Sequence, residues 1–162
     1  MNEIFLAELC GYWCLFARES VRAVVPRPSC TVVNREERAW LILAEKEAAE
    51  VCPLHLLFNW PQPTDAPADH LLVLRRGPRL CALPMHGPGR DCMARLDMIH
   101  ALPPAFPALS RRLVPGLLVN GNDVIMRVNL GELLQAMDKI AQLRRKKRLA
   151  RQQADQAGGG RS

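Results

Sequence analysis

Cysteine and histidine are the residues of this chain that could carry metal or nucleophilic chemistry. There are six cysteines and four histidines, and no two cysteines form a C-x-x-C pair. The densest grouping, between Cys81 and His100, has no spacing typical of a zinc module. Most of the cysteines lie in apolar stretches, as buried thiols do. We therefore expect no metal site, and thiols that stay reduced and buried.

The sequence also lacks the residue constellations of the common catalytic sites. No serine or cysteine lies in a G-x-S-x-G frame, and no G-x-x-x-x-G-K loop is present to bind phosphate. Acid pairs such as Glu36 with Glu37, or Asp123 with Glu132, fall in turns or at a helix start, where acids are expected anyway. The sequence predicts a protein without enzymatic activity and without a cofactor.

The positive charge of the chain is concentrated at its C-terminal end. The formal net charge is +6, and residues 138–162 hold eight Lys or Arg against two acids, while the remainder holds 14 of each sign. A basic run in this tail could bind nucleic acid, anionic lipid headgroups or an acidic partner. The alternative is a solvated helix end that complements the helix dipole. The run consists of Arg144, Arg145, Lys146, Lys147 and Arg148.

Length and composition indicate one domain, or two small lobes that share a core. The chain has 162 residues, of which 49% are hydrophobic and 23% charged, which suffices for a core without disulfides. Thirteen prolines and ten glycines argue against a helical bundle. The apolar run at residues 4–17 contains Glu8, lacks the flanks of a signal peptide and is too short to span a bilayer. We expect a cytoplasmic protein.

Short apolar runs separated by turn residues predict a mainly β fold. Two runs on either side of Cys10-Gly11 predict an opening hairpin. Residues 45–50 predict helix or loop, residues 85–90 a loop, and the proline-rich residues 60–69 an extended linker. Further strands are expected at residues 21–25, 30–33, 40–43, 70–74, 80–84, 113–119 and 124–128.

The hydrophobic period changes from strand to helix after Asn129. Apolar residues then recur at helical spacing, and Asn129 three residues before Glu132 predicts an N-cap. The helix is expected to begin near Leu130 and to fray before Gly158, with residues 152–162 disordered. We thus expect a domain at 1–143, with lobes at 21–68 and 69–128 and the hairpin and helix between them, followed by a basic tail at 144–162.

The last strands and the helix resemble the CheW-like family, the coupling proteins of bacterial chemotaxis. Residues 113–119 and the turn at 120–123 resemble the family's strand and turn, and residues 124–134 resemble its closing strand and helix. Residues 21–25 and 51–57 resemble two earlier elements more loosely. Where the family commonly has Arg-Gly, residues 44–47 read Ala-Glu-Lys-Glu.

The resemblance implies two small SH3-like β-barrel lobes around a shared core, with a C-terminal α-helix and no catalysis. It implies an adaptor that binds the regulatory domain of a histidine kinase and, in a groove between the lobes, the cytoplasmic tip of a chemoreceptor. Ordinary barrel core is the alternative for the partner-facing residues, and a tail that binds nucleic acid or anionic membrane is the alternative function. The partner-facing residues that the family suggests are Val21, Val24, Val25, Leu117 and Val119.

Overall fold

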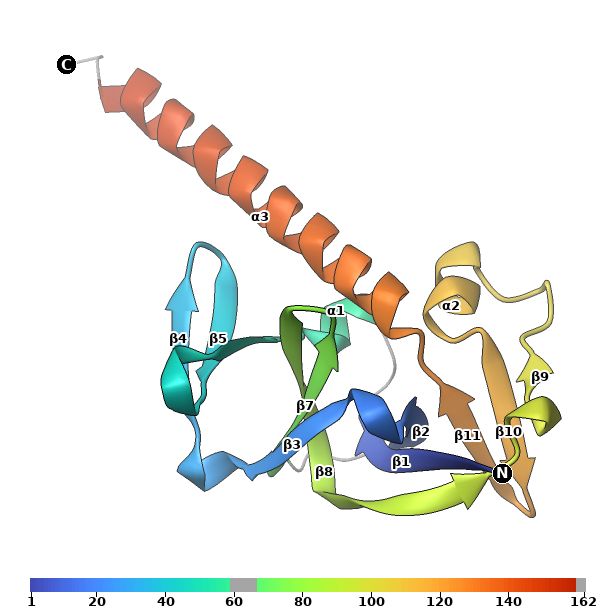
Figure 1. Ribbon diagram of the computed structural model, residues 1–162. Coiled ribbons are helices and arrows are strands. Elements are labelled where there is room, and N and C mark those ends of the chain that lie inside the picture. Colours follow the sequence, from blue (N-terminus) through green and yellow to red (C-terminus); the bar gives the residue numbers. More distant parts are fainter. Residues whose placement is uncertain (59–66, 160–162) are drawn as a thin grey trace.

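The computed structural model describes residues 1–58 and 67–159, so most of the predicted linker and the last three residues lie outside it. Figure 1 shows strands followed by one long C-terminal helix, as the sequence predicted. The helices are α1 (Leu54–Leu57), α2 (Ala108–Leu113) and α3 (Leu130–Gly159). The strands are β1 (Asn2–Leu9), β2 (Tyr12–Ala17), β3 (Val21–Pro26), β4 (Thr31–Arg35), β5 (Arg38–Ile42), β6 (Ala48–Val51), β7 (His70–Arg76), β8 (Arg79–Ala94), β9 (His100–Ala101), β10 (Gly116–Asn120) and β11 (Asp123–Arg127).

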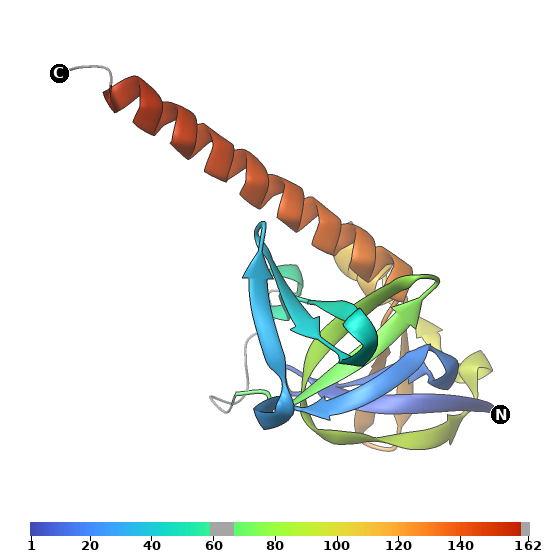
Figure 2. The same ribbon diagram turned by 60° about the vertical axis from the view of Figure 1, so that its left-hand side comes forward.

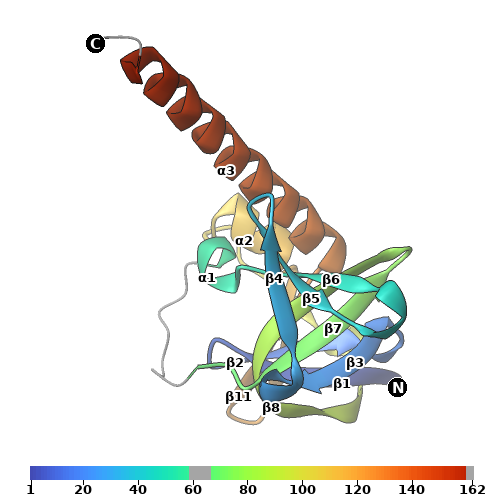
Figure 3. The same ribbon diagram turned by 90° about the vertical axis from the view of Figure 1, so that its left-hand side faces the viewer.

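Strand β8 connects two groups of strands. Its first half pairs antiparallel with β7 and parallel with β6. Cys81, for example, lies between Leu74 of β7 and Glu50 of β6. Its second half pairs antiparallel with β1, where Cys92 lies opposite Ile4. One group therefore contains β3 to β7, which Figure 3 shows at the front, and the other contains β1, β2 and β9 to β11.

Closure of either group into a barrel is not confirmed. The strand path runs β4-β5-β6-β8-β1-β2-β11-β10-β9, with β7 and β3 branching from β8. The first group therefore ends at β3 and β4, and the second at β8 and β9. No pairing among the described residues joins either pair of ends. The mainly β class and the C-terminal helix predicted from the sequence are thus confirmed, whereas the barrel shape is not.

Strand pairing groups the chain differently from the predicted lobe limits at 21–68 and 69–128. Strand β7 and the first half of β8 pair with β3 and β6, and so belong with the first group. The opening hairpin contributes two strands to the second group, because β2 pairs in parallel with β11. The predicted domain limits therefore stay a proposal.

One local prediction was wrong, and another was right only in part. Residues 85–90, expected to be a loop, continue strand β8, because Gly87 and Gly89 adopt positive φ of 70° and 66° and bend the strand without ending it. In the stretch 45–50, expected to be helix or loop, residues 45–46 belong to a short 3-10 helix, whereas residues 48–50 form most of β6 between β5 and β8. Neighbouring strands here supply a context that overrides a weak strand propensity.

Helix α3 begins where the sequence predicted. The backbone N–H of Glu132 donates to the side-chain oxygen of Asn129 at 3.2 Å, which is the expected cap. Its first turns bury Leu133, Leu134 and Met137 in the largest core cluster, together with Phe5. These contacts fix the helix against both strand groups.

The end of α3 was predicted wrongly. Residues 152–157, expected to be disordered, continue the helix, which runs to Gly159. The stretch after Leu143 consists mainly of Arg, Lys, Gln, Ala and Leu, which are strong helix formers. Figure 2 shows this outer part of the helix extending away from the strands.

Candidate functional site

Four charged side chains from four elements form one ion-pair network beneath α3. Arg38 of β5 donates through Nη1 to both carboxylate oxygens of Glu50 of β6, at 2.9 and 3.0 Å. Arg79 of β8 donates to Glu50 at 2.9 Å and to Asp138 of α3 at 2.7 and 3.0 Å. Arg38 also reaches Asp138 at 3.3 Å. The network ties the helix to the first strand group.

The charges of this network balance one another. Two guanidinium groups face two carboxylates, and Glu50 is only 4% exposed. The hydrogen bond from Arg79 lowers the pKa of Asp138 from its ordinary value, so this carboxylate stays ionised. A buried carboxylate is tolerated when it is paired and hydrogen-bonded in this way. The network therefore positions α3 and leaves no uncompensated charge for substrate chemistry.

A cleft of about 390 Å³ lies beside the network, between α3, strands β5 and β6, and α1. Met137, Ile140 and Ala141 of α3 form part of its apolar wall. Arg144 and His55 provide polar groups. This volume is within the range of small-molecule sites. The apolar lining of the cleft suits binding of an apolar group more than proton transfer.

Burial keeps the cysteines near this cleft protonated. All six cysteines are free, and Cys10 and Cys52 line the cleft. Desolvation raises the pKa of Cys10 and Cys52, and that of Cys81 to about 12. Because the thiolate is the reactive form, these thiols are poor nucleophiles at neutral pH. Within residues 1–58 and 67–159, no group of three or more His, Cys, Asp or Glu is arranged to hold a metal ion.

The five residues suggested as partner-facing do not share one strand face. Val21 and Val24 of β3, like Leu117 of β10, are half-buried against the largest core cluster. Val25 packs against the cluster inside the first strand group. Val119 of β10, in contrast, is 57% exposed. Strands β3 and β10 belong to different strand groups, so only Val119 offers most of its side chain to a partner.

A second exposed valine, which sequence reasoning missed, lies opposite Val119. Val124 of β11 is its antiparallel pair and is 52% exposed. The two form an apolar pair next to the hairpin turn at Asn120–Asp123. The turn signal in the sequence predicts this hairpin, and hence that residues 119 and 124 face each other.

Part of the predicted basic run is tied to the body of the protein. Arg144 donates to the backbone oxygen of Glu37 at 3.3 Å, and Arg148 Nε pairs with the Glu37 carboxylate at 2.9 Å. Glu37 belongs to the turn between β4 and β5 and has a φ of 64°. The side chains of Arg145, Lys146 and Lys147 are exposed and form no ion pair with the described residues. No helix in the described ranges is both long and apolar enough to cross a membrane.

Comparison with known proteins gives a match at the level of structure. The sequence matches no protein-family model and no curated protein. The structure is similar to that of the scaffolding protein TtCheW from Thermoanaerobacter tengcongensis, with a TM-score of 0.65 and 15% sequence identity. The match covers 82% of this chain and 86% of that chain. The chain therefore has a CheW-like fold.

Proposed function

We propose that this protein is a non-catalytic adaptor that couples a chemoreceptor to a histidine kinase in a chemotaxis-type pathway. The observation that carries the proposal is the extent of the structural match. A match over 82% of this chain and 86% of TtCheW is too large to be confined to one strand group. An adaptor needs a separate surface for each partner, and a body of two strand groups joined by β8 has room for one partner on a strand group and for another between the groups.

The chemistry of the described residues supports a binding role. The four charged side chains beside the cleft form ion pairs with one another. They are Arg38, Glu50, Arg79 and Asp138. The thiols beside the cleft are held protonated by burial. A catalytic site needs a base and a nucleophile within reach of each other and matched in pKa. The groups around the cleft favour association with a partner, and we propose no cofactor.

We propose that the β10–β11 hairpin contacts the regulatory domain of the kinase. Val119 and Val124 present an exposed apolar pair there. Burial of exposed apolar side chains is the main favourable term in protein association. The half-buried Leu117, on the same strand as Val119, would then support the binding surface from below.

We propose that the chemoreceptor tip binds between the two strand groups. The loop at residues 44–47 differs from the Arg-Gly of the family. In the structure Lys46 has a φ of 64°, the conformation that glycine adopts most readily, so the loop keeps a tight turn without glycine. Glu47 pairs with Arg75 at 3.4 Å and with Arg22 at 3.7 Å. We expect receptor recognition to depend on this acidic, paired loop.

The proposal is tested by isothermal titration with the purified regulatory domain of a chemotaxis-type kinase from the same organism. We expect micromolar binding, and at least tenfold weaker binding for Val119→Asp, because a charge would enter an apolar contact. The matched control is Val32→Asp, which alters a valine that is 45% exposed on β4, in the other strand group. Absence of binding by the wild-type chain, or equal loss in both variants, would contradict the proposal.

A further inference from the structure

The outer part of α3 is a strongly charged surface, and most of its cations form no ion pair with the rest of the described protein. Residues 144–159 hold six Lys or Arg and one acid, Asp155. Every residue from Gln142 to Gly159 is exposed. Figures 1 and 2 show this stretch leaving the strands. The rest of the chain carries almost no net charge, so nearly all of the excess positive charge of the protein lies in this part of the helix.

Two of the six cationic side chains contact the β4–β5 turn, and the other four form no ion pair with the described residues. Arg144 and Arg148 both contact Glu37. Beyond Arg148, no hydrogen bond or ion pair joins the described part of the helix to another element. Residues 149–159 therefore project by about 16 Å, at a rise of about 1.5 Å per residue. The unpaired cations are Arg145, Lys146, Lys147 and Arg151.

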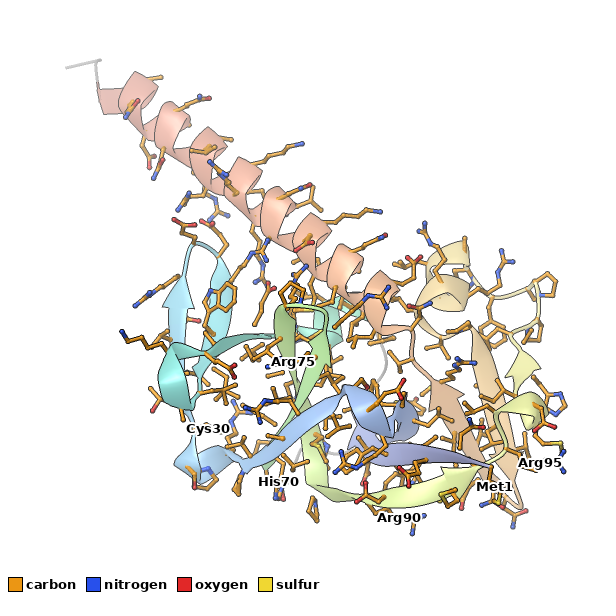
Figure 4. All side chains as sticks on the ribbon, viewed as in Figure 1. Met1, Cys30, His70, Arg75, Arg90 and Arg95 are labelled. Atoms are coloured by element: carbon orange, nitrogen blue, oxygen red, sulfur yellow. The ribbon has the colours of Figure 1, made fainter. Side chains whose placement is uncertain are left out.

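The unpaired cations point to different sides of the helix. Arg145, Lys146 and Lys147 are consecutive, and successive side chains are turned by about 100°. Arg151, four residues after Lys147, returns to nearly the same side as Lys147. Figure 4 shows nitrogen-tipped side chains on both sides of the outer helix. A flat anionic surface would contact only one of these sides.

The outer helix also lacks the apolar face that insertion into a membrane surface requires. Leu143 and Leu149 are both exposed, but they are six residues apart and so point in directions that differ by about 120°. No aromatic residue occurs after Leu143. Interfacial helices bind through a continuous apolar stripe, which is missing here.

We propose that the outer part of α3 binds double-stranded DNA by entering its major groove. This groove is about 12 Å wide, admits one α-helix and has phosphates along both walls. A helix with cations on several sides can contact both walls at once. The contacts are to phosphates, so we expect binding without sequence preference. This proposal is independent of the adaptor function.

The proposal is tested with the full-length protein by fluorescence anisotropy on a short mixed-sequence DNA duplex. Four phosphate contacts predict a slope of about −3.6 for log affinity against log salt. The affinity should therefore fall about 150-fold between about 50 and 200 mM salt. A parallel arm measures co-sedimentation with vesicles of phosphatidylcholine and phosphatidylglycerol.

Two variants of equal net charge locate the binding surface. The helix variant should bind the duplex at least about 100-fold more weakly at low salt, and it should remain helical because Gln is a good helix former. The control variant should bind like the wild type. The helix variant is Arg145→Gln, Lys146→Gln, Lys147→Gln and Arg151→Gln. The control variant is Arg27→Gln, Arg95→Gln, Arg111→Gln and Arg112→Gln, all at exposed positions.

Three results would overturn the proposal. They are equal weakening in both variants, binding to vesicles without binding to the duplex, and duplex binding that is insensitive to salt. Titration of the helix variant with the kinase regulatory domain separates the two proposed activities. If that binding is kept while duplex binding is lost, the two activities use different surfaces.

Discussion

At the scale of single residues, Glu50 is the clearest example of a side chain that serves the fold. It is 4% exposed, and it accepts hydrogen bonds from Arg38 and Arg79. Both arginines also reach Asp138, so the carboxylate of Glu50 connects two strands and the helix. Without its charge, two guanidinium groups would face each other with only Asp138 between them.

We predict that Glu50→Gln lowers the free energy of unfolding by about 2 kcal/mol, because it leaves two half-buried cations with Asp138 as their one remaining partner in the network. The measurement is urea unfolding followed by circular dichroism. The matched control is Glu36→Gln, at an exposed acid in the β4–β5 turn, which should change stability by less than about 0.5 kcal/mol. Similar values for the two variants would mean that the network does not hold α3 on the sheet.

The sequence could not predict this network. Glu50 lies 12 residues from Arg38 and 29 from Arg79, and Asp138 lies 100 residues from Arg38. No local sequence pattern predicts ion pairs between residues so far apart in the chain, because these pairs form only when β5, β6, β8 and α3 come together. The resemblance suggested Val119, whereas Val124 was missed, although the turn signal at residues 120–123 places it opposite Val119.

At the scale of elements, strand β8 depends on two glycines with different surroundings. Both have positive φ. A Cβ on Gly89 would meet the ring of Phe5 and lie 2.8 Å from the Leu6 carbonyl oxygen, while a Cβ on Gly87 would meet nothing within 4 Å. Gly89 thus allows β8 to bend closely over β1.

We predict that Gly89→Ala destabilises the protein by about 3 kcal/mol, from the backbone conformation together with overpacking against Phe5. We expect Gly87→Ala to lower the free energy of unfolding by about 1 kcal/mol, because alanine is strained in the positive-φ conformation but meets no neighbouring atom there. Thermal unfolding of the two variants side by side measures the difference. Equal losses would show that close packing on Phe5 does not limit this bend.

Elements with a strong local signal were predictable, and those shaped by their neighbours were not. The opening hairpin, strand β11 and the Asn129 cap follow from apolar runs, turn residues and capping chemistry. Strand β6, which reads Ala48-Ala49-Glu50-Val51, has little intrinsic preference for a strand and is ordered by pairing with β5 and β8.

At the scale of the whole molecule, one long strand and one helix hold two groups of strands together. Strand β8 belongs to both groups, and α3 packs on the largest core cluster, which contains residues from both. The two groups therefore keep a fixed relation to each other. A rigid body with two separate surfaces is suited to holding two partners at a set distance, which is the task of the proposed adaptor.

The most direct test of this account is reconstitution of kinase control. Autophosphorylation of the chemotaxis-type kinase from the same organism is measured with receptor cytoplasmic fragments, with and without this protein. We predict that the receptor changes kinase activity only when the protein is present, and that Val119→Asp abolishes this dependence while Val32→Asp preserves it. Kinase activity that responds to receptor equally with and without the protein would contradict the account.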